Sequence, residues 1–116
     1  ADIYLDVLPA KNINLPSIPA GKNHTWQTFH TVLPKRYDRN KVIEQLKQKG
    51  IGANYGAQCS PAVTFYQKKY AHNCTEKFPH SLQAFNNGLA LPLYPQLTEK
   101  NITYIAHELN KILEND

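Results

Sequence analysis

Residues 50–61 have the sequence GIGANYGAQCSP, and AVTFY follows at residues 62–66. The opening Gly-Ile step predicts the end of a helix, because glycine often occupies the position after the last helical turn. A short apolar strand is expected next, and glycine and proline then break it into a polar loop. Loops carried by rigid elements often hold binding residues. Four side chains of this loop are therefore candidates for contacting a ligand: Asn54, Tyr55, Gln58 and Ser60. The alternative is a surface connection whose polar groups satisfy one another.

The chain has 116 residues, the size of one ordinary domain with a core of its own. Its net charge is +4, and its lysines and arginines are scattered, so nucleic-acid binding is only weakly indicated and we predict none. No apolar run approaches the roughly 20 residues of a membrane span, and we see no signal-peptide pattern. We therefore predict a cytoplasmic protein without a membrane partner. Because methionine is absent, we expect the chain to be a piece of a longer protein.

The chain has two cysteines, Cys59 and Cys74. In a cytosolic protein they are expected to be free thiols, because disulfides are rare in that compartment. Three N-x-[ST] triplets, which begin at Asn23, Asn73 and Asn101, leave a different interpretation open. It is a small secreted glycoprotein domain with a Cys59–Cys74 bridge.

Residues 1–22 contain three prolines and show little periodicity. The spacing of the prolines is unfavourable for a helix or a central strand. Residues 2–8 are the exception, since they could be the tail of a helix that belongs to a preceding domain. We therefore predict a linker or lead-in over residues 1–22 and a small domain over residues 23–116.

Residues 24–33 are rich in β-branched and aromatic side chains, which predicts a strand that ends at Pro34. Asp38 is placed to cap a following helix over residues 39–48, whose apolar residues fall on one face. Residues 51–55 are then expected to form a second strand.

The second half of the chain is expected to contain mostly helices. We predict helices over residues 64–70 and 78–85, then a short strand near the sheet edge at Leu89–Leu91. Thr98 is expected to cap a final helix with one apolar stripe, made of Ile102, Ile105, Ala106, Leu109, Ile112 and Leu113. The predicted fold class is therefore α/β: a small sheet of about three, mostly antiparallel strands with helices packed on one face.

The chain has no complete catalytic or metal-binding motif. None of its histidines has zinc-ligand spacing, and His72 with Cys74 supplies only two ligands. The Gly50–Gly52 turn lacks the third glycine and the helix of a phosphate-binding loop. A Cys59 nucleophile has no supporting pattern, and paired carboxylates are missing. The chain therefore looks like one half of a binding site.

The order of the motifs closely resembles that of one enzyme family. The relevant segments are HTWQTFH at residues 24–30, KGIG at 49–52, FY at 65–66, FP at 78–79 and LPLYPQLT at 91–98. Together with the tyrosine-bearing loop they are similar to the C-terminal domain of the DegT/DnrJ/EryC1/StrS aminotransferases over about residues 20–114. The resemblance implies the small domain of a fold-type I, pyridoxal-phosphate-dependent aminotransferase. Within it, His24 and Trp26 either face the large domain or belong to a packed strand.

The resemblance also implies what the parent protein does. The parent transfers an amino group, usually from glutamate, to a keto sugar carried on a nucleotide, and it is a homodimer. A missing N-terminal large domain supplies the lysine that binds pyridoxal phosphate. No lysine here matches that position, so four are expected to be solvated surface charges: Lys47, Lys49, Lys68 and Lys69. The chain alone is expected to be inactive and to bind no cofactor.

In the family, the small domain contributes a loop to the nucleotide-sugar cleft, and the matching loop here is residues 54–60. Many members have a His-Tyr pair and a second histidine in this loop, whereas this chain has Asn54-Tyr55 and no histidine, which leaves the sugar open. The residues predicted to bind substrate are Tyr55, Gln58, Asn54, Ser60 and Tyr66. The alternative interpretation is a stand-alone binding or regulatory module without catalytic activity.

Overall fold

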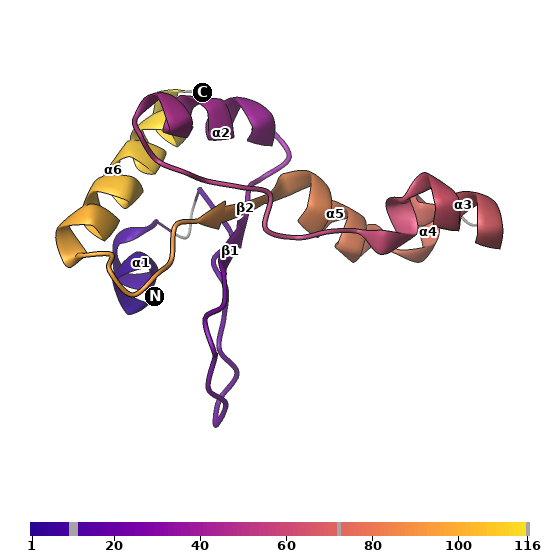
Figure 1. Ribbon diagram of the computed structural model, residues 1–116, viewed down its shortest axis with the longest axis horizontal. Coiled ribbons are helices and arrows are strands. Elements are labelled where there is room, and N and C mark those ends of the chain that lie inside the picture. The colour runs from indigo at the N-terminus through magenta and orange to yellow at the C-terminus, as the bar shows by residue number, and fades with distance from the viewer. Residues whose placement is uncertain (10–11, 72, 116) are drawn as a thin grey trace.

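The computed structural model describes residues 1–9, 12–71 and 73–115, and it consists of a body and two arms (Figure 1). The helices and strands of the body are α1 (Asp2–Val7), β1 (Phe29–Val32), α2 (Arg39–Gln48), β2 (Gly88–Leu91) and α6 (Glu99–Asn115). The loop arm is residues 15–28, drawn in purple below the body. The helical arm is residues 59–87, which contain the 3-10 helix η1 (Ser60–Ala62), α3 (Thr64–Tyr70), α4 (Cys74–Lys77) and α5 (Pro79–Asn87).

The arms make the molecule less compact than its length suggests. Its radius of gyration is 15.5 Å, against about 13 Å for a compact domain of this size. The body holds the core, and the helical arm carries α3 and α4 away from it (Figure 1). The loop that was predicted to bind substrate leads from the body into this arm.

The sheet is antiparallel, as predicted, but the described residues contain two strands rather than about three. The segment expected as a strand at residues 51–55 is extended but pairs with the sheet only through Asn54. The Asn54 N–H donates to the Ala90 carbonyl over 3.0 Å, and the Asn54 carbonyl accepts from the Ala90 N–H over 2.7 Å. Glycines on both sides of this segment weaken further pairing. In this two-stranded sheet β2 is an edge strand, as was predicted, and the bridge to Asn54 covers it only at Ala90.

The first strand is shorter than predicted, since it begins at Phe29 and not at His24. Trp26 interrupts the extended run with a positive φ of 50°, a conformation that a non-glycine residue rarely adopts. Its ring packs on the Phe29 ring at 5.6 Å between centroids and on His24 at 4.1 Å. The prediction that His24 and Trp26 sit in a packed strand is therefore wrong, although Trp26 does pack against the core.

The helices follow the capping and periodicity signals closely. The Asp38 carboxylate accepts a hydrogen bond from the Asn40 N–H at the start of α2, and Thr98 Oγ1 accepts one from the Asn101 N–H at the start of α6. Every member of the predicted apolar stripe of α6 is buried. The bounds of α3 match the expected residues 64–70, and α5 covers most of the helix expected at 78–85.

The core lies on one face of the sheet, as the predicted fold class requires. Phe29 and Thr31 of β1 and their partners Leu91 and Leu89 of β2 are buried on this face, where α1, α2 and α6 pack. Thr31 satisfies its buried hydroxyl by donating to the Leu89 carbonyl over 2.9 Å.

Residues 1–22, predicted as a linker, also contribute to this core. Tyr4 of α1, Leu8 and Ile13 are buried in the same cluster as α6, and the Tyr4 hydroxyl donates to the Pro92 carbonyl over 2.9 Å. Burial raises the pKa of this hydroxyl, and Tyr94 adds to the shift. The domain boundary near residue 22 stays a prediction, but α1, Leu8 and Ile13 pack on the body.

None of the helices in the described part of the chain combines the length and the apolar character that a membrane-spanning helix requires.

Candidate functional site

The predicted substrate loop starts alongside β2, on the side of this strand opposite β1. Asn54 pairs with β2 there, and its side-chain carbonyl accepts a hydrogen bond from the Tyr55 N–H over 2.7 Å. Tyr55 is 42% exposed. Gly56 follows with a φ of +76°, which turns the chain towards the helical arm. The start of the loop is thus fixed by backbone pairing, and Tyr55 is partly open to solvent.

Arg39, the first residue of α2, connects three segments around Tyr55. Its guanidinium lies 4.1 Å from the centre of the Tyr55 ring, a cation–π contact. The same group donates from Nη1 to the Phe85 carbonyl over 2.9 Å and to the Gly88 carbonyl over 3.2 Å. One side chain therefore holds the candidate loop, the last turn of α5 and the start of β2 in a fixed arrangement.

His30 packs beneath the same loop. It lies on the outward face of β1, opposite Ala90, and Gly56 and Gly88 leave room for its ring. A Cβ at Gly56 would lie 2.5 Å from His30 Cδ2 and 2.9 Å from Ala90 Cβ. Burial lowers the pKa of His30, and the Ala84 backbone partly offsets this shift. Its Nε2 is buried with no hydrogen-bond partner among the described residues.

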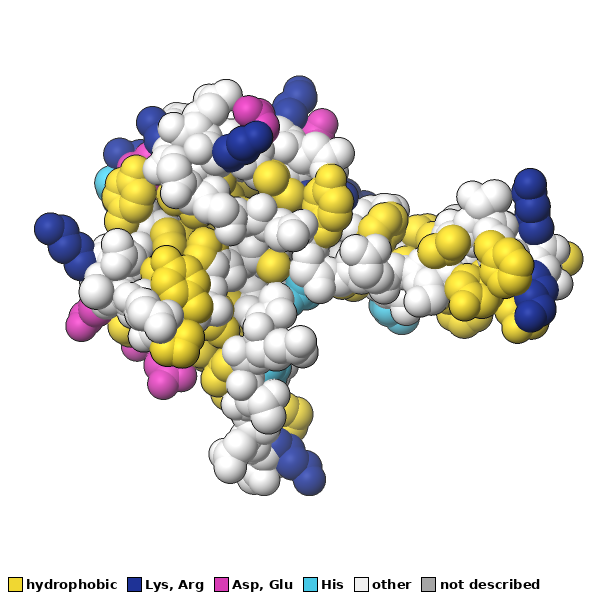
Figure 2. Space-filling model, in the orientation of Figure 1, with side chains coloured by type: hydrophobic (Ala, Val, Ile, Leu, Met, Phe, Trp, Pro, Cys, Tyr) yellow, Lys and Arg dark blue, Asp and Glu magenta, His cyan; other side chains and the backbone are white. Residues whose placement is uncertain are grey.

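The helical arm carries the other predicted residues. Ser60 and Tyr66 line a groove of about 500 Å³ together with Pro61, Tyr70, Lys77 and Phe78. Figure 2 shows hydrophobic side chains gathered over the end of this arm, with positively charged side chains beside them. Tyr66 is 41% exposed and stacks on Tyr70 with ring planes 6° apart. The groove offers a mostly apolar, aromatic surface.

The five predicted residues therefore fall into two groups. Asn54 and Tyr55 lie at the sheet beside Arg39, while Ser60 and Tyr66 line the groove of the helical arm. Gln58 is exposed on the segment between the two groups. Whether any of them binds substrate stays a prediction.

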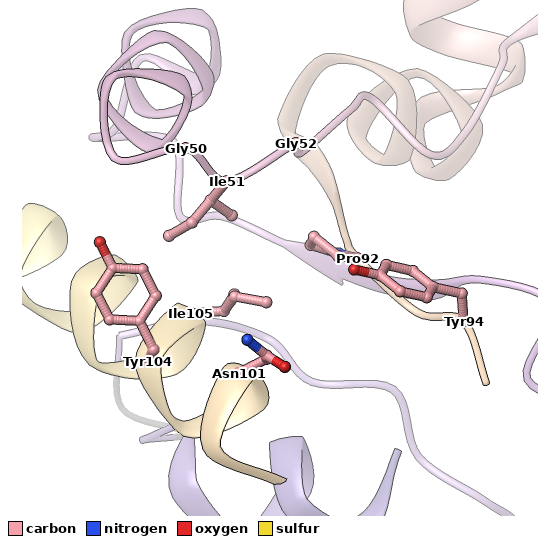
Figure 3. Close-up of a pocket in the computed structure, with 8 residues that line it drawn as sticks. All are labelled: Gly50, Ile51, Gly52, Pro92, Tyr94, Asn101, Tyr104 and Ile105. Carbon is pink, nitrogen blue, oxygen red and sulfur yellow. The ribbon is translucent and has the colours of Figure 1, made fainter. Parts of the chain in front are cut away.

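A second pocket, of about 390 Å³, lies on the body between α6 and the turns that follow α2 and β2 (Figure 3). Its lining includes Tyr104 and Asn101 of α6, but both already serve the fold. The Tyr104 hydroxyl donates to the Lys49 carbonyl over 3.2 Å, and Asn101 caps α6 with Thr98. Because none of the five predicted residues lines this pocket, we do not assign it to the candidate site.

Sequence reasoning missed Arg39 and His30. One signal for Arg39 was available, since a positive side chain in the first turn of a helix opposes the helix dipole and so suggests another partner. His30 alternates with the inward-facing residues of its strand, so the sequence predicts that it lies on the outward face. The sequence does not predict that a loop covers it there. Its contact with Gly56 depends on residues far apart in the sequence.

Replacing Arg39 with methionine is expected to lower the free energy of unfolding by about 2 kcal/mol, through loss of hydrogen bonds from a charged donor and of the contact with Tyr55. Denaturant titration measures the change, and hydrogen exchange is expected to become faster at residues 54–58 and 85–88. Lys41→Met, at an exposed position of the same helix, is the control and is expected to stay within about 0.5 kcal/mol. Equal losses in the two variants would refute the connecting role of Arg39.

Every described lysine is exposed, whereas a lysine that forms a Schiff base is activated by a desolvated or charged site. Among the described residues, no group of three or more histidine, cysteine or acidic side chains is arranged to hold a metal ion. His72, one half of the two-ligand pair considered from the sequence, lies outside the described residues.

Comparison with known sequences links the chain to one family. A model of the DegT/DnrJ/EryC1/StrS aminotransferase family matches residues 1–110. The UDP-N-acetyl-3-dehydro-alpha-D-glucosamine 3-aminotransferase of Acidithiobacillus ferrooxidans is 29% identical over 110 residues, or 95% of this chain and 28% of that protein. The uncharacterized protein MJ1066 of Methanocaldococcus jannaschii is 23% identical over 104 residues, or 87% of this chain and 27% of that protein. The chain thus spans little more than a quarter of these relatives.

Solved structures show the same fold. PseC of Helicobacter pylori, an aminotransferase involved in the biosynthesis of pseudoaminic acid, superposes with a TM-score of 0.83 at 14% identity, over 98% of this chain and 31% of that one. A DegT DnrJ EryC1 StrS aminotransferase from Brucella abortus superposes with a TM-score of 0.76 at 22% identity, over 94% of this chain and 28% of that one. At these identities the likeness concerns the fold.

Proposed function

The chain belongs to the DegT/DnrJ/EryC1/StrS aminotransferase family, and on this premise we propose that it is the C-terminal domain of a pyridoxal-phosphate-dependent sugar aminotransferase. The family match over residues 1–110 carries the proposal. The share of the relatives that the chain covers, 27% and 28%, supports a parent protein with a further large domain. That large domain lies on the N-terminal side of the chain.

The parent transfers an amino group from glutamate to a keto sugar linked to a nucleotide. Pyridoxal phosphate supplies the group that carries nitrogen between the two substrates. The exposed lysines of this chain support a cofactor site elsewhere in the parent, so the chain by itself binds no cofactor and is inactive. The parent is a cytoplasmic homodimer. The name of the Acidithiobacillus relative supports a UDP-linked sugar as the first substrate to test.

The role of this chain is to close and shape the sugar side of the cleft. Tyr55 and Gln58 hydrogen-bond the substrate, and Asn54, Ser60 and Tyr66 contribute further contacts. Arg39 orients Tyr55 through its stacked guanidinium, so the phenol is held in place before substrate arrives. A loop fixed in this way loses less conformational entropy on binding.

The test is made on the complete reading frame that encodes this chain. We expect it to contain a large domain and its product to transfer nitrogen from glutamate to a UDP-linked keto sugar, followed as 2-oxoglutarate. Tyr55→Phe and Gln58→Ala are each expected to raise KM for the sugar about tenfold, the effect of losing one good hydrogen bond. Tyr104→Phe removes a hydroxyl that bonds Lys49 and should leave KM unchanged.

Three outcomes would count against the proposal or a part of it. A reading frame without a large domain would favour a stand-alone binding or regulatory module. A complete protein that transfers no nitrogen from glutamate to any nucleotide-linked keto sugar would reject the sugar aminotransferase itself. Equal KM values for Tyr55→Phe and Tyr104→Phe would leave the family intact but remove Tyr55 from the site.

A further inference from the structure

The helical arm has almost no buried core. Among the described residues from 57 to 87, the only buried side chains are those of Cys59 and Cys74. η1, α3 and α5 have no buried side chain in the described structure, and neither cysteine belongs to the core of the body. The two thiols are therefore the centre around which the arm folds.

The two cysteines meet across the whole length of α3. Cys59 is the residue before η1, Cys74 is the first residue of α4, and their sulfur atoms are 3.8 Å apart as free thiols. A disulfide requires about 2.05 Å between the sulfur atoms, so the pair must close by somewhat less than 2 Å. Because α3 is exposed along its length, it offers little resistance to that movement.

We propose that Cys59 and Cys74 form a site of reversible oxidation, at which a small-molecule disulfide generates an intramolecular bond that ties the candidate substrate loop to α4. The oxidation of the two thiols does not require the proposed transfer reaction. Folds too small to bury a sufficient core use disulfides in its place, and the helical arm is such a fold. The bond fixes the segment that carries Gln58 and Ser60, because both are neighbours of Cys59.

The chemistry is two successive thiol–disulfide exchanges. The thiolate of one cysteine attacks a sulfur of the reagent disulfide, forms a mixed disulfide and releases one reagent thiol. The thiolate of the second cysteine then attacks the protein sulfur of the mixed disulfide and displaces the second reagent thiol. In total the two cysteines lose two electrons and two protons. The reagent disulfide takes up these electrons and protons and is reduced to two thiols.

Burial of the two thiols slows this exchange, but opening of the helical arm allows it. Burial and the neighbouring Cys59 raise the pKa of the Cys74 thiol, which keeps the fraction of reactive thiolate low. Reagent reaches the sulfur atoms when the arm opens. Local opening requires little free energy where few apolar side chains are buried, as in this arm.

In the test, the full chain is equilibrated with mixtures of reduced and oxidised glutathione, and thiol–disulfide exchange is then stopped with acid. The intact mass of the chain is measured with a thiol label added before and after denaturation. We expect a monomer that has lost the two thiol hydrogens and takes up no label once denatured, with glutathione adducts as minor species. Two free thiols in the most oxidising mixture would overturn the proposal. Stable glutathione adducts without an internal bond would also overturn it. This measurement needs no variant.

A second readout tests the tie to α4. In the oxidised chain we expect amide hydrogen exchange at residues 60–74 to slow about a hundredfold, the size expected for closing a loop of 15 residues, while exchange in α6 stays unchanged. Cys59→Ser is the matched control. It retains one thiol, can form only a glutathione adduct, and should not show the slower exchange. Unchanged exchange in an oxidised wild-type chain would reject the fixed loop.

Discussion

Phe29→Ala is expected to lower the free energy of unfolding by about 4 kcal/mol, the largest effect of a single substitution that we predict. The Phe29 ring is fully buried and packs on Tyr4 at 4.8 Å and on Trp26 at 5.6 Å between ring centroids. Its removal leaves a cavity where α1, β1 and the loop arm meet. Because all three segments surround the cavity, none of them can fill it alone. Urea titration followed by far-ultraviolet circular dichroism measures the loss.

Phe65→Ala is the matched control for Phe29→Ala. Phe65 lies on α3 of the helical arm and is 62% exposed, so its removal opens no cavity in the core. We expect its free energy of unfolding to stay within about 0.5 kcal/mol of wild type. If the two variants lost the same stability, the core would not be centred on Phe29.

Gly88→Ala is expected to cost about 3 kcal/mol, for the opposite reason: it adds an atom where there is no space. A Cβ at Gly88 would lie 2.8 Å from the Tyr55 carbonyl oxygen, and it would come still closer to the Ala84 carbonyl oxygen and to His30 Nε2. Two of these three atoms belong to the backbone, so relief requires moving the candidate loop or the end of α5. Denaturant titration measures the effect.

Gly52→Ala provides the contrast. A Cβ at Gly52 would meet nothing within 4 Å, so this variant is expected to stay within about 0.5 kcal/mol of wild type. Similar stabilities for the two alanine variants would mean that the sheet and the loop do not approach each other as closely as the structure has them.

The elements that could be predicted from the sequence are those whose signals are local. Asp38 caps α2 and the apolar stripe of α6 is buried, because capping and periodicity involve residues within one or two turns. The predicted start of the first strand at residue 24 was wrong. The composition of this segment favours a strand, but Trp26 adopts a left-handed conformation and stacks on Phe29, which interrupts it. Tertiary packing here overrides local propensity.

The candidate site could be predicted only in part, for a related reason. The tyrosine-bearing loop was recognisable from its glycines and polar residues. The guanidinium that holds Tyr55 was not, because the partners of Arg39 lie 46 and 49 residues further along the chain. The meeting of Cys59 and Cys74 depends on α3 folding back between them, which neither residue's neighbours reveal. Contacts of this kind require the tertiary structure.

The packing of α1 against α6 has a consequence for how this domain is made. The Tyr4 hydroxyl bonds to the Pro92 carbonyl, 88 residues away, and α1 shares a core with the last helix. During synthesis the N-terminal helix therefore emerges long before its partner and must wait, with its apolar side uncovered, until α6 has left the ribosome. Folding that depends on contacts so distant in sequence is slow, and exposed apolar surface in the waiting chain is where chaperones would bind.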